Sequence, residues 1–212
     1  MNYFELVNKC LVELNYKQVN AFSELTKNDH KKIKNIINVI NNEVCGYDNW
    51  NFKLRKSEVT LAKNTNEIDN PVDGRIASIV IDGHVYKYFD KPELYIMKQA
   101  PKNSYSCFND KLLLPEFEEE KLINIVYYTA NSVITGDGKE KKILEAETDK
   151  SLIPDVFAEP ILVYGTCMRL KANPQHVKFS YWLSMYNTAL ATMRSKISID
   201  SNAAPSVKMH RY

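Results

Sequence analysis

The chain has few of the features that indicate a chemical activity. Its six glycines form neither a G-x-x-x-x-G-K-[ST] nor a G-x-G-x-x-G pattern, so no phosphate-binding loop is predicted. A G-x-S-x-G motif, typical of serine hydrolases, is also missing. The four cysteines and four histidines stand far apart, without the C-x-x-C or H-x-x-x-H spacing of a metal site. The sequence therefore predicts no metal, no cofactor and no enzymatic activity.

Two further absences concern membranes and nucleic acids. No apolar run approaches the roughly 20 residues that a membrane-spanning helix needs, so we expect no membrane partner. The first residues lack the basic and apolar segments of a signal peptide, which predicts synthesis in the cytoplasm. The 28 basic and 26 acidic residues leave a net charge of +2, too small a surplus to predict non-specific binding to DNA.

What the sequence does contain is helical periodicity at both ends. Apolar stripes run through residues 2–15 and 28–45, and Gly46 is expected to end the second helix. Two more helices are expected over 154–172 and 175–196. A lone helical hairpin would leave each large apolar side chain in water at a cost of about 1.5–3 kcal/mol. We therefore expect the two hairpins to share one interior.

Between these ends the period of the apolar residues changes to two, which favours strands. Trp50 and Phe52 alternate with polar neighbours, and further β-rich runs follow at 76–81, 84–89, 94–97 and 122–128. The dipeptide Asp82-Gly83 between two of these runs is typical of a tight hairpin.

These patterns predict an α+β protein with a discontinuous four-helix domain. Its N- and C-terminal helical hairpins comprise residues 1–48 plus 153–198, and an antiparallel β module, 49–152, is inserted between them. Residues 199–212 show no apolar period and are expected to form a flexible C-terminal tail. The last helix has apolar side chains over about half of its circumference, whereas a single core needs an arc of about 100°. The excess predicts a second contact, either with the β module or with another copy of the chain.

A metal-dependent nuclease is the least favoured interpretation of the acidic residues. It would use Glu118, within the run Glu116 to Glu120, or Asp155. Adjacent glutamates point in different directions, which is typical of a solvated loop. Asp155 is fully explained as the start of a helix, and no acidic-x-Lys strand follows it.

Three segments carry a resemblance to a known family. Residues 34–43 followed by Trp50-Asn-Phe52 are similar to a second helix that runs into a Trp-containing strand, and 151–161 resembles a helix entry after a β insertion. Residues 170–174, with Trp182, Tyr186 and Met193, resemble a closing helical pair. In this order the segments resemble the head-to-tail adaptor (connector) proteins of tailed bacteriophages, such as the tail tubular A protein family of short-tailed phages.

The resemblance implies a structural, non-enzymatic virion protein at the head–tail junction. It implies a ring, a dodecamer, that docks on the portal protein and meets the next tail component, while DNA passes through the channel without being read. Subunit contact is expected at the helix faces around Trp182, Tyr186 and Met193. The portal contact is expected in the C-terminal tail, at Ala203, Pro205, Val207, Met209 and Tyr212.

A function of another class remains open. The chain has 13 tyrosines, and many lie in the predicted β insertion. That insertion is alternatively a carbohydrate- or host-surface-binding module, with tyrosine rings that stack on sugars.

Overall fold

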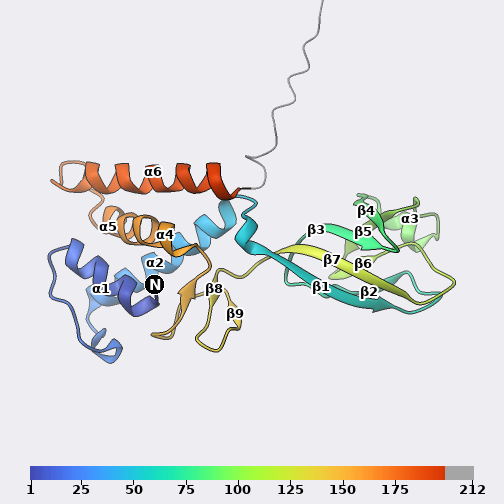
Figure 1. Ribbon diagram of the computed structural model, residues 1–212, viewed down its shortest axis with the longest axis horizontal. Helices are drawn as coiled ribbons and strands as arrows, with labels where there is room; N and C mark the ends of the chain where they lie inside the picture. The colour runs from blue at the N-terminus through green and yellow to red at the C-terminus, as the bar shows by residue number, and fades with distance from the viewer. Residues whose placement is uncertain (199–212) are drawn as a thin grey trace, which may run out of the picture. The chain divides into compact units, whose positions relative to one another are not determined.

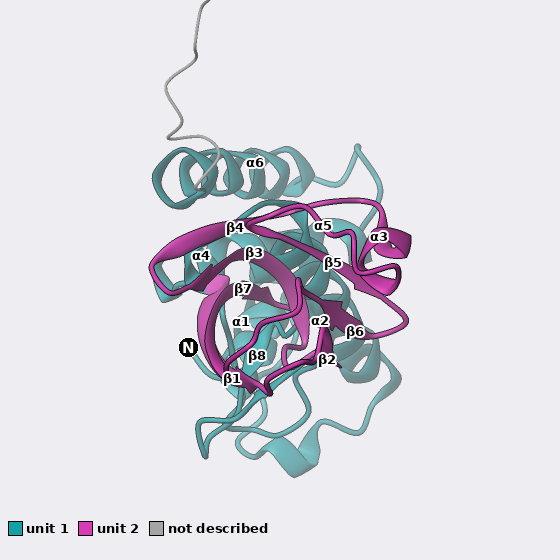
Figure 2. Cartoon of the chain, turned by 90° about the vertical axis from the view of Figure 1, so that its right-hand side faces the viewer, with its two compact units in different colours: residues 1–52, 131–212 teal, residues 53–130 magenta. Residues whose placement is uncertain are grey.

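A computed structural model describes residues 1–198 and divides the chain into two compact units (Figures 1 and 2). The first, here called the terminal unit, comprises Met1–Phe52 and the chain from Asn131 onward. The second, here called the inserted unit, is the continuous segment Lys53–Ala130. No helix within residues 1–198 is long and apolar enough to cross a membrane.

The terminal unit is mainly helical. Its helices are α1 (Tyr3–Glu13), α2 (Asn28–Tyr47), α4 (Asp155–Ala158), the π-helical turn η3 (Glu159–Val163), α5 (Tyr164–Leu170) and α6 (Phe179–Ile197), with a 3-10 turn η1 (Phe22–Glu24). Asn2 caps α1 in a capping box with Glu5, which satisfies free N–H groups of the first turn. Pro160 lies in η3, where a residue without an N–H donor interrupts the regular hydrogen-bond ladder. Gly46 does not end α2, because the helix continues to Tyr47.

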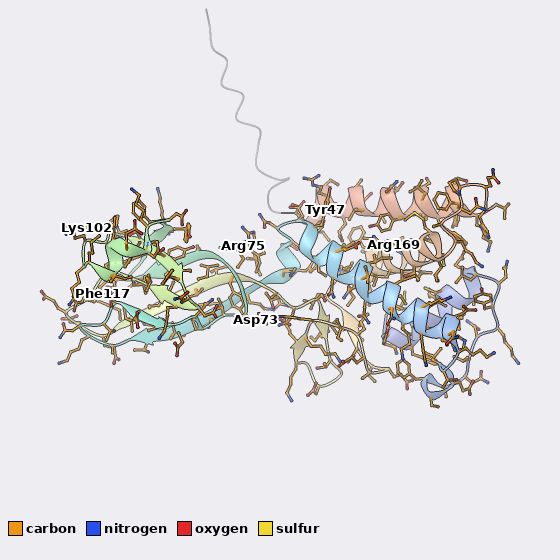
Figure 3. All side chains as sticks on the ribbon, turned by 180° about the vertical axis from the view of Figure 1, so that it is seen from behind. Tyr47, Asp73, Arg75, Lys102, Phe117 and Arg169 are labelled. Carbon is orange, nitrogen blue, oxygen red and sulfur yellow. The ribbon has the colours of Figure 1, made fainter. Side chains whose placement is uncertain are left out.

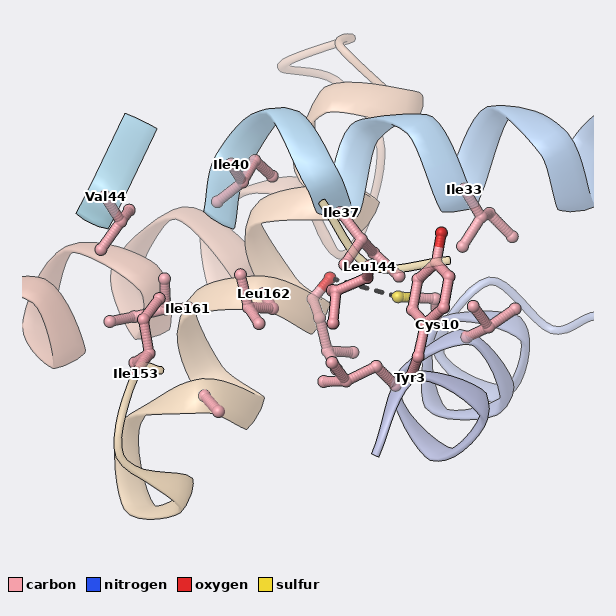
Figure 4. Close-up of a cluster of buried hydrophobic side chains, with 14 of the residues drawn as sticks. Tyr3, Cys10, Ile33, Ile37, Ile40, Val44, Leu144, Ile153, Ile161 and Leu162 are labelled. Atoms are coloured by element: carbon pink, nitrogen blue, oxygen red, sulfur yellow. Dashed lines mark hydrogen bonds between the residues drawn. The ribbon is translucent and has the colours of Figure 1, made fainter. Parts of the chain in front are cut away.

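Helices from both ends of the chain share one core, as predicted (Figure 4). Ile37 and Ile40 of α2 pack with Leu162 of η3, and all three are fully buried. Cys10 of α1 lies in the same core, with its Sγ 4.0 Å from the carbonyl oxygen of Val163. At the surface, the N-terminal amine of Met1 forms an ion pair with Asp155.

A small sheet completes the terminal unit. Its strands are β8 (Val133–Ile134), β9 (Glu140–Lys141) and β10 (Lys150–Ser151), in the order β10-β8-β9. The fully buried Asn41 of α2 links the sheet to the helices, because it donates to the Ser132 carbonyl at 3.0 Å and accepts from Ser151 Oγ at 2.5 Å. Residues 131–152 therefore lie with the helices, whereas we had placed them in the β module, 49–152.

The inserted unit is built on a curved seven-stranded sheet with the order β1-β7-β3-β4-β5-β6-β2. Its strands are β1 (Leu54–Leu61), β2 (Glu67–Asp69), β3 (Gly74–Ile81), β4 (His84–Tyr88), β5 (Ser104–Phe108), β6 (Lys111–Leu113) and β7 (Lys121–Thr129). Ile79, Ile81, Ile123 and Ile125 project from β3 and β7 into a second core, separate from that of the helices. The register pairs Ile79 with Ile125 and Ile81 with Ile123.

The predicted hairpin at Asp82-Gly83 is confirmed. Ile81 pairs with His84 across the turn, and both turn residues have positive φ angles, 50° and 78°. This is the backbone conformation that an Asp-Gly turn of this type requires.

The predicted fold class is wrong. The chain is α+β, but its large sheet is mixed and nearly closed like a barrel, and the helices do not form a four-helix domain with an inserted antiparallel β module. β4 and β5 pair in parallel because α3 (Pro92–Ile96) lies in the connection between them. We had interpreted 94–97 as a strand; Pro92 at the first helical turn favours the helix instead. We had also expected Trp50 and Phe52 in a strand. Both lie before β1, and Asn51–Lys53 forms a 3-10 turn.

Candidate functional site

The residues that we expected at a subunit contact anchor α6 to its own unit. Trp182 and Met193 are fully buried, and Tyr186 is half-buried. The indole Nε1 of Trp182 donates to the Glu13 carboxylate at 3.1 Å, and its ring stacks on His176 with 5.1 Å between the centroids. These side chains thus face the interior of the terminal unit. The five residues expected at the portal contact, from Ala203 to Tyr212, lie outside the described residues.

The opposite side of α6 presents an uncharged surface to solvent. We call it the outward face of α6, and it consists of Tyr181, Leu183, Ser184, Met185, Asn187, Thr188 and Ala191, all of which are exposed. The chain has no charged side chain between Phe179 and Met193. A solvated helix normally carries charged residues on the face opposite its core. The outward face therefore has the character of an interface rather than of ordinary protein surface.

The packing beneath α6 holds this face in a fixed position. A Cβ atom added to Gly165 of α5 would lie 3.0 Å from the Tyr186 ring, so the glycine allows α5 and α6 to approach closely. The rings of Tyr164 and Tyr181 meet edge to face, with 5.5 Å between centroids. The hydrogen bond from Tyr181, together with burial, raises the pKa of Tyr164 well above its ordinary value. Tyr164 therefore stays neutral at physiological pH.

Ion pairs mark the two ends of the outward face. Before α6, the Lys178 ammonium lies 3.8 Å from the Glu13 carboxylate, and near its end Arg194 Nε donates to Asp48 at 3.0 Å. Arg169 of α5 forms a further ion pair with Glu43 of α2, and Figure 3 shows Arg169 over the helices of this unit. An uncharged centre with a charged rim fits the anatomy of a protein–protein interface, in which charged residues are depleted at the core.

A second candidate surface lies in the inserted unit. It is a groove of about 470 Å³ beside β3, β4 and β5, lined by Asn70, Gly74, Arg75, Ile76, Tyr88, Tyr105 and Cys107. From the sequence we considered the tyrosine-rich insertion as an alternative sugar-binding module, but we did not single out these residues. Their positions along the chain give no local signal, because the loop after β2 and the strands β3, β4 and β5 bring them together.

The two residues considered for a nuclease belong to different units. Asp155 begins α4 in the terminal unit and is engaged by the N-terminal amine, whereas Glu118 is exposed between β6 and β7 of the inserted unit. Within the part of the chain that the structure describes, no three acidic, histidine or cysteine side chains are grouped to hold a metal ion.

Comparison with known proteins gives no family for the chain: no protein-family model matches it, and no curated protein matches its sequence.

Proposed function

We propose that the chain is a structural, non-enzymatic virion protein, the subunit of a head-to-tail adaptor ring that docks on the portal and connects it to the tail. The ring, a dodecamer in the related adaptors that the sequence resembles, would surround the channel through which DNA passes. The observation that carries this proposal is the uncharged outward face of α6.

The outward face gains free energy when a neighbour covers it. Tyr181, Leu183 and Met185 are between 37% and 48% exposed, so burying the rest of each would contribute about 1 kcal/mol, a fraction of the 1.5–3 kcal/mol for full burial. The total burial free energy of these three side chains is small for one contact between two copies. In a closed ring every copy makes two contacts, and the geometry of closure adds to the affinity of each.

A ring also requires that the outward face meet a different surface of the next copy. If α6 met α6 of a second copy, the contact would be isologous and would close as a dimer. Exposed apolar side chains on other elements of the terminal unit, such as Val12 of α1 and Val39 of α2, offer a second surface. We infer a head-to-tail contact between α6 of one copy and these helices of the next.

The first experiment measures the mass of the purified full chain by light scattering, alone and with the portal ring of the same phage. We expect Met185→Glu to prevent ring formation, because each contact would then bury an unpaired carboxylate. Val85→Glu is the control, since Val85 of β4 is also exposed, at 58% against 37% for Met185, but lies in the inserted unit. Assembly by Met185→Glu at the level of the unaltered chain would contradict the proposal.

The second experiment tests the proposed portal contact. A chain that ends at Ser198 keeps every described residue, including the bridge between Ser198 and Trp50. We expect this truncated chain to fold normally and to lose its binding to portal rings, because Ala203, Pro205, Val207, Met209 and Tyr212 are removed. Portal binding that survives the truncation would refute the assignment of these residues, but not the assignment of the outward face.

A further inference from the structure

The groove of the inserted unit arises where two strands separate. β3 and β4 pair only between Ile79 and Ile81 on one strand and His84 and Tyr86 on the other. Beyond Tyr86, β4 turns to β5 and pairs in parallel with it, with Tyr88 opposite Tyr105. The first half of β3 is therefore not paired to β4, and the groove lies beside it. The mouth of a barrel-like sheet is a common place for a ligand site.

The groove has aromatic rings and planar polar groups within one open surface. Tyr88 and Tyr105 meet edge to face, with 5.6 Å between centroids, and Tyr88 is 54% exposed although Tyr105 is buried. The Arg75 guanidinium lies over the Tyr128 ring at 4.9 Å, which orients it, and Figure 3 labels it on this unit. Asn70 is held by its backbone N–H to Asp110, and its side chain carries an amide NH₂ that can donate.

The chemistry of this lining narrows the class of ligand. A fatty or steroid-like molecule would need an enclosed apolar cavity, but here Tyr88, Arg75 and Cys107 are exposed. An anion would meet Arg75, but it would also approach Asp69, Asp73 and Asp110, which line the adjacent hollow. A neutral sugar suits a lining that is open to solvent and lies near carboxylates. Its C–H face packs on a tyrosine ring, and its hydroxyl groups pair with amide and guanidinium donors.

From these observations we infer that the groove formed by Asn70, Arg75, Ile76, Tyr88 and Tyr105 binds a neutral oligosaccharide. Its volume of about 470 Å³ lies within the range of roughly 300–1,000 Å³ for small-ligand sites. Tyr88 provides the stacking surface, and Arg75 and Asn70 bind hydroxyl groups. This site does not depend on ring assembly through α6.

Cys107 provides a reporter within the groove. It is the exposed cysteine among the four, since Cys10, Cys45 and Cys167 are buried. The full chain is applied to an array of neutral malto-, cello-, chito- and galacto-oligosaccharides, and any sugar that is retained is then tested for protection of Cys107 against a maleimide reagent. We expect at least one sugar to bind and to slow the labelling of Cys107 about fivefold or more at saturation.

Three variants separate stacking from a general loss of structure. We expect Tyr88→Ala to weaken sugar binding about tenfold or more, because it removes the stacking ring. Tyr88→Phe keeps the ring and is expected to bind within about threefold of the unaltered chain. Tyr47→Ala, at an equally exposed tyrosine of the terminal unit, is expected to bind normally.

Several results would overturn the inference. An array on which no neutral sugar is retained is one, and a bound sugar that leaves Cys107 labelling unchanged is another. Retention of acidic sugars or peptides alone, or full binding by Tyr88→Ala, would also contradict it.

Discussion

The two units are assembled from the chain in opposite ways. The core of the inserted unit comes from one continuous segment, Lys53–Ala130, whereas that of the terminal unit needs helices that lie more than a hundred residues apart. Ile37 of α2 packs in the same cluster as Leu162 and Trp182. Long-range contacts of this kind form late, since loop closure must precede them. The terminal unit is therefore complete only when the last helix has been made. The inserted unit needs only its own segment, Lys53–Ala130.

The candidate surfaces differ in the same way. The outward face of α6 is a helix surface without charge, supported by packing of α5 below it. The groove of the inserted unit is an opening between strands, lined by rings and planar polar groups. The first suits a large, flat protein partner and the second a small ligand. In our two proposals, assembly belongs to the terminal unit and ligand recognition to the inserted unit.

The largest test of this comparison is removal of the chain after Ala130. We expect the terminal unit to unfold completely in the 1–130 fragment, because α1 and α2 lose the partners that bury Ile33, Ile37 and Ile40. The inserted unit should stay folded, since Leu54 and Tyr128 pair at its two ends. Trp50 is the tryptophan left in this fragment, so its emission should move to that of an exposed indole while dispersed amide signals of 53–130 persist in NMR spectra. A buried Trp50 in the fragment would contradict the dependence on the C-terminal helices.

Matched cavities test whether the units unfold separately. Ile37→Ala in the terminal unit and Ile125→Ala in the inserted unit each truncate a fully buried isoleucine, and each should cost about 3 kcal/mol of its own unit's stability. Both tryptophans, Trp50 and Trp182, lie in the terminal unit. Tryptophan emission in urea should therefore shift for Ile37→Ala and not for Ile125→Ala. A single transition that both variants shift equally would show that the units unfold as one.

Sequence patterns predicted the local elements better than their partners. The stripes of α1 and α2 and the Asp82-Gly83 hairpin follow from periodicity and turn chemistry alone. The order of strands does not, because β7 pairs with β1 and β3 through contacts that periodicity cannot specify. Helix α3 was interpreted as a strand since a five-residue helix is too short to show a period.

The candidate surfaces show the same limit. The broad apolar arc of α6 predicted a second contact, but periodicity could not say which of its residues face the core. Trp182 and Met193 proved to be buried, and the exposed residues lie opposite them. The absence of charge between Phe179 and Met193, which is visible in the sequence, distinguishes α6 from an ordinary solvated helix more clearly than the apolar arc does. The groove had no such signal, because Asn70, Tyr88 and Tyr105 meet only after the sheet has curved.

Asp149 offers a pH test confined to the terminal unit. Its Oδ2 accepts from Lys141 Nζ and from the backbone N–H groups of Glu145 and Ala146, each at 2.7 Å. Burial acts to raise the pKa of Asp149, but these hydrogen bonds and the Lys141 charge outweigh it, and the pKa is lowered. Its charged form therefore stabilises the folded state above its unfolded pKa of about 3.9, and this stabilisation is lost as the pH falls through the lower folded pKa.

We expect Asp149→Asn to lower the stability of the terminal unit by about 2 kcal/mol at neutral pH, since a charged hydrogen-bond acceptor is lost. The difference from the unaltered chain should stay constant from about pH 8 to pH 5 and shrink below about pH 4, where Asp149 of the unfolded chain begins to take up a proton. This difference in stability is measured by urea denaturation, followed by tryptophan emission, at several pH values. A difference that grows on acidification would have the wrong sign and would exclude this role for the charge.

The smallest expected effects come from two helical glycines of the terminal unit, and they have opposite signs. Gly165→Ala places a methyl group 3.0 Å from the Tyr186 ring and 3.1 Å from Ile40 Cδ1, which should cost about 1 kcal/mol by overpacking. Gly46 lies within α2 with open space around it, so Gly46→Ala should stabilise the unit by about 0.5–1 kcal/mol through helix propensity. Both changes are measured by urea denaturation followed by tryptophan emission, and neither should shift the unfolding of the inserted unit. If Gly165→Ala were neutral, α6 would be less closely held than the structure indicates, and the outward face would lack the rigidity on which our proposal of assembly relies.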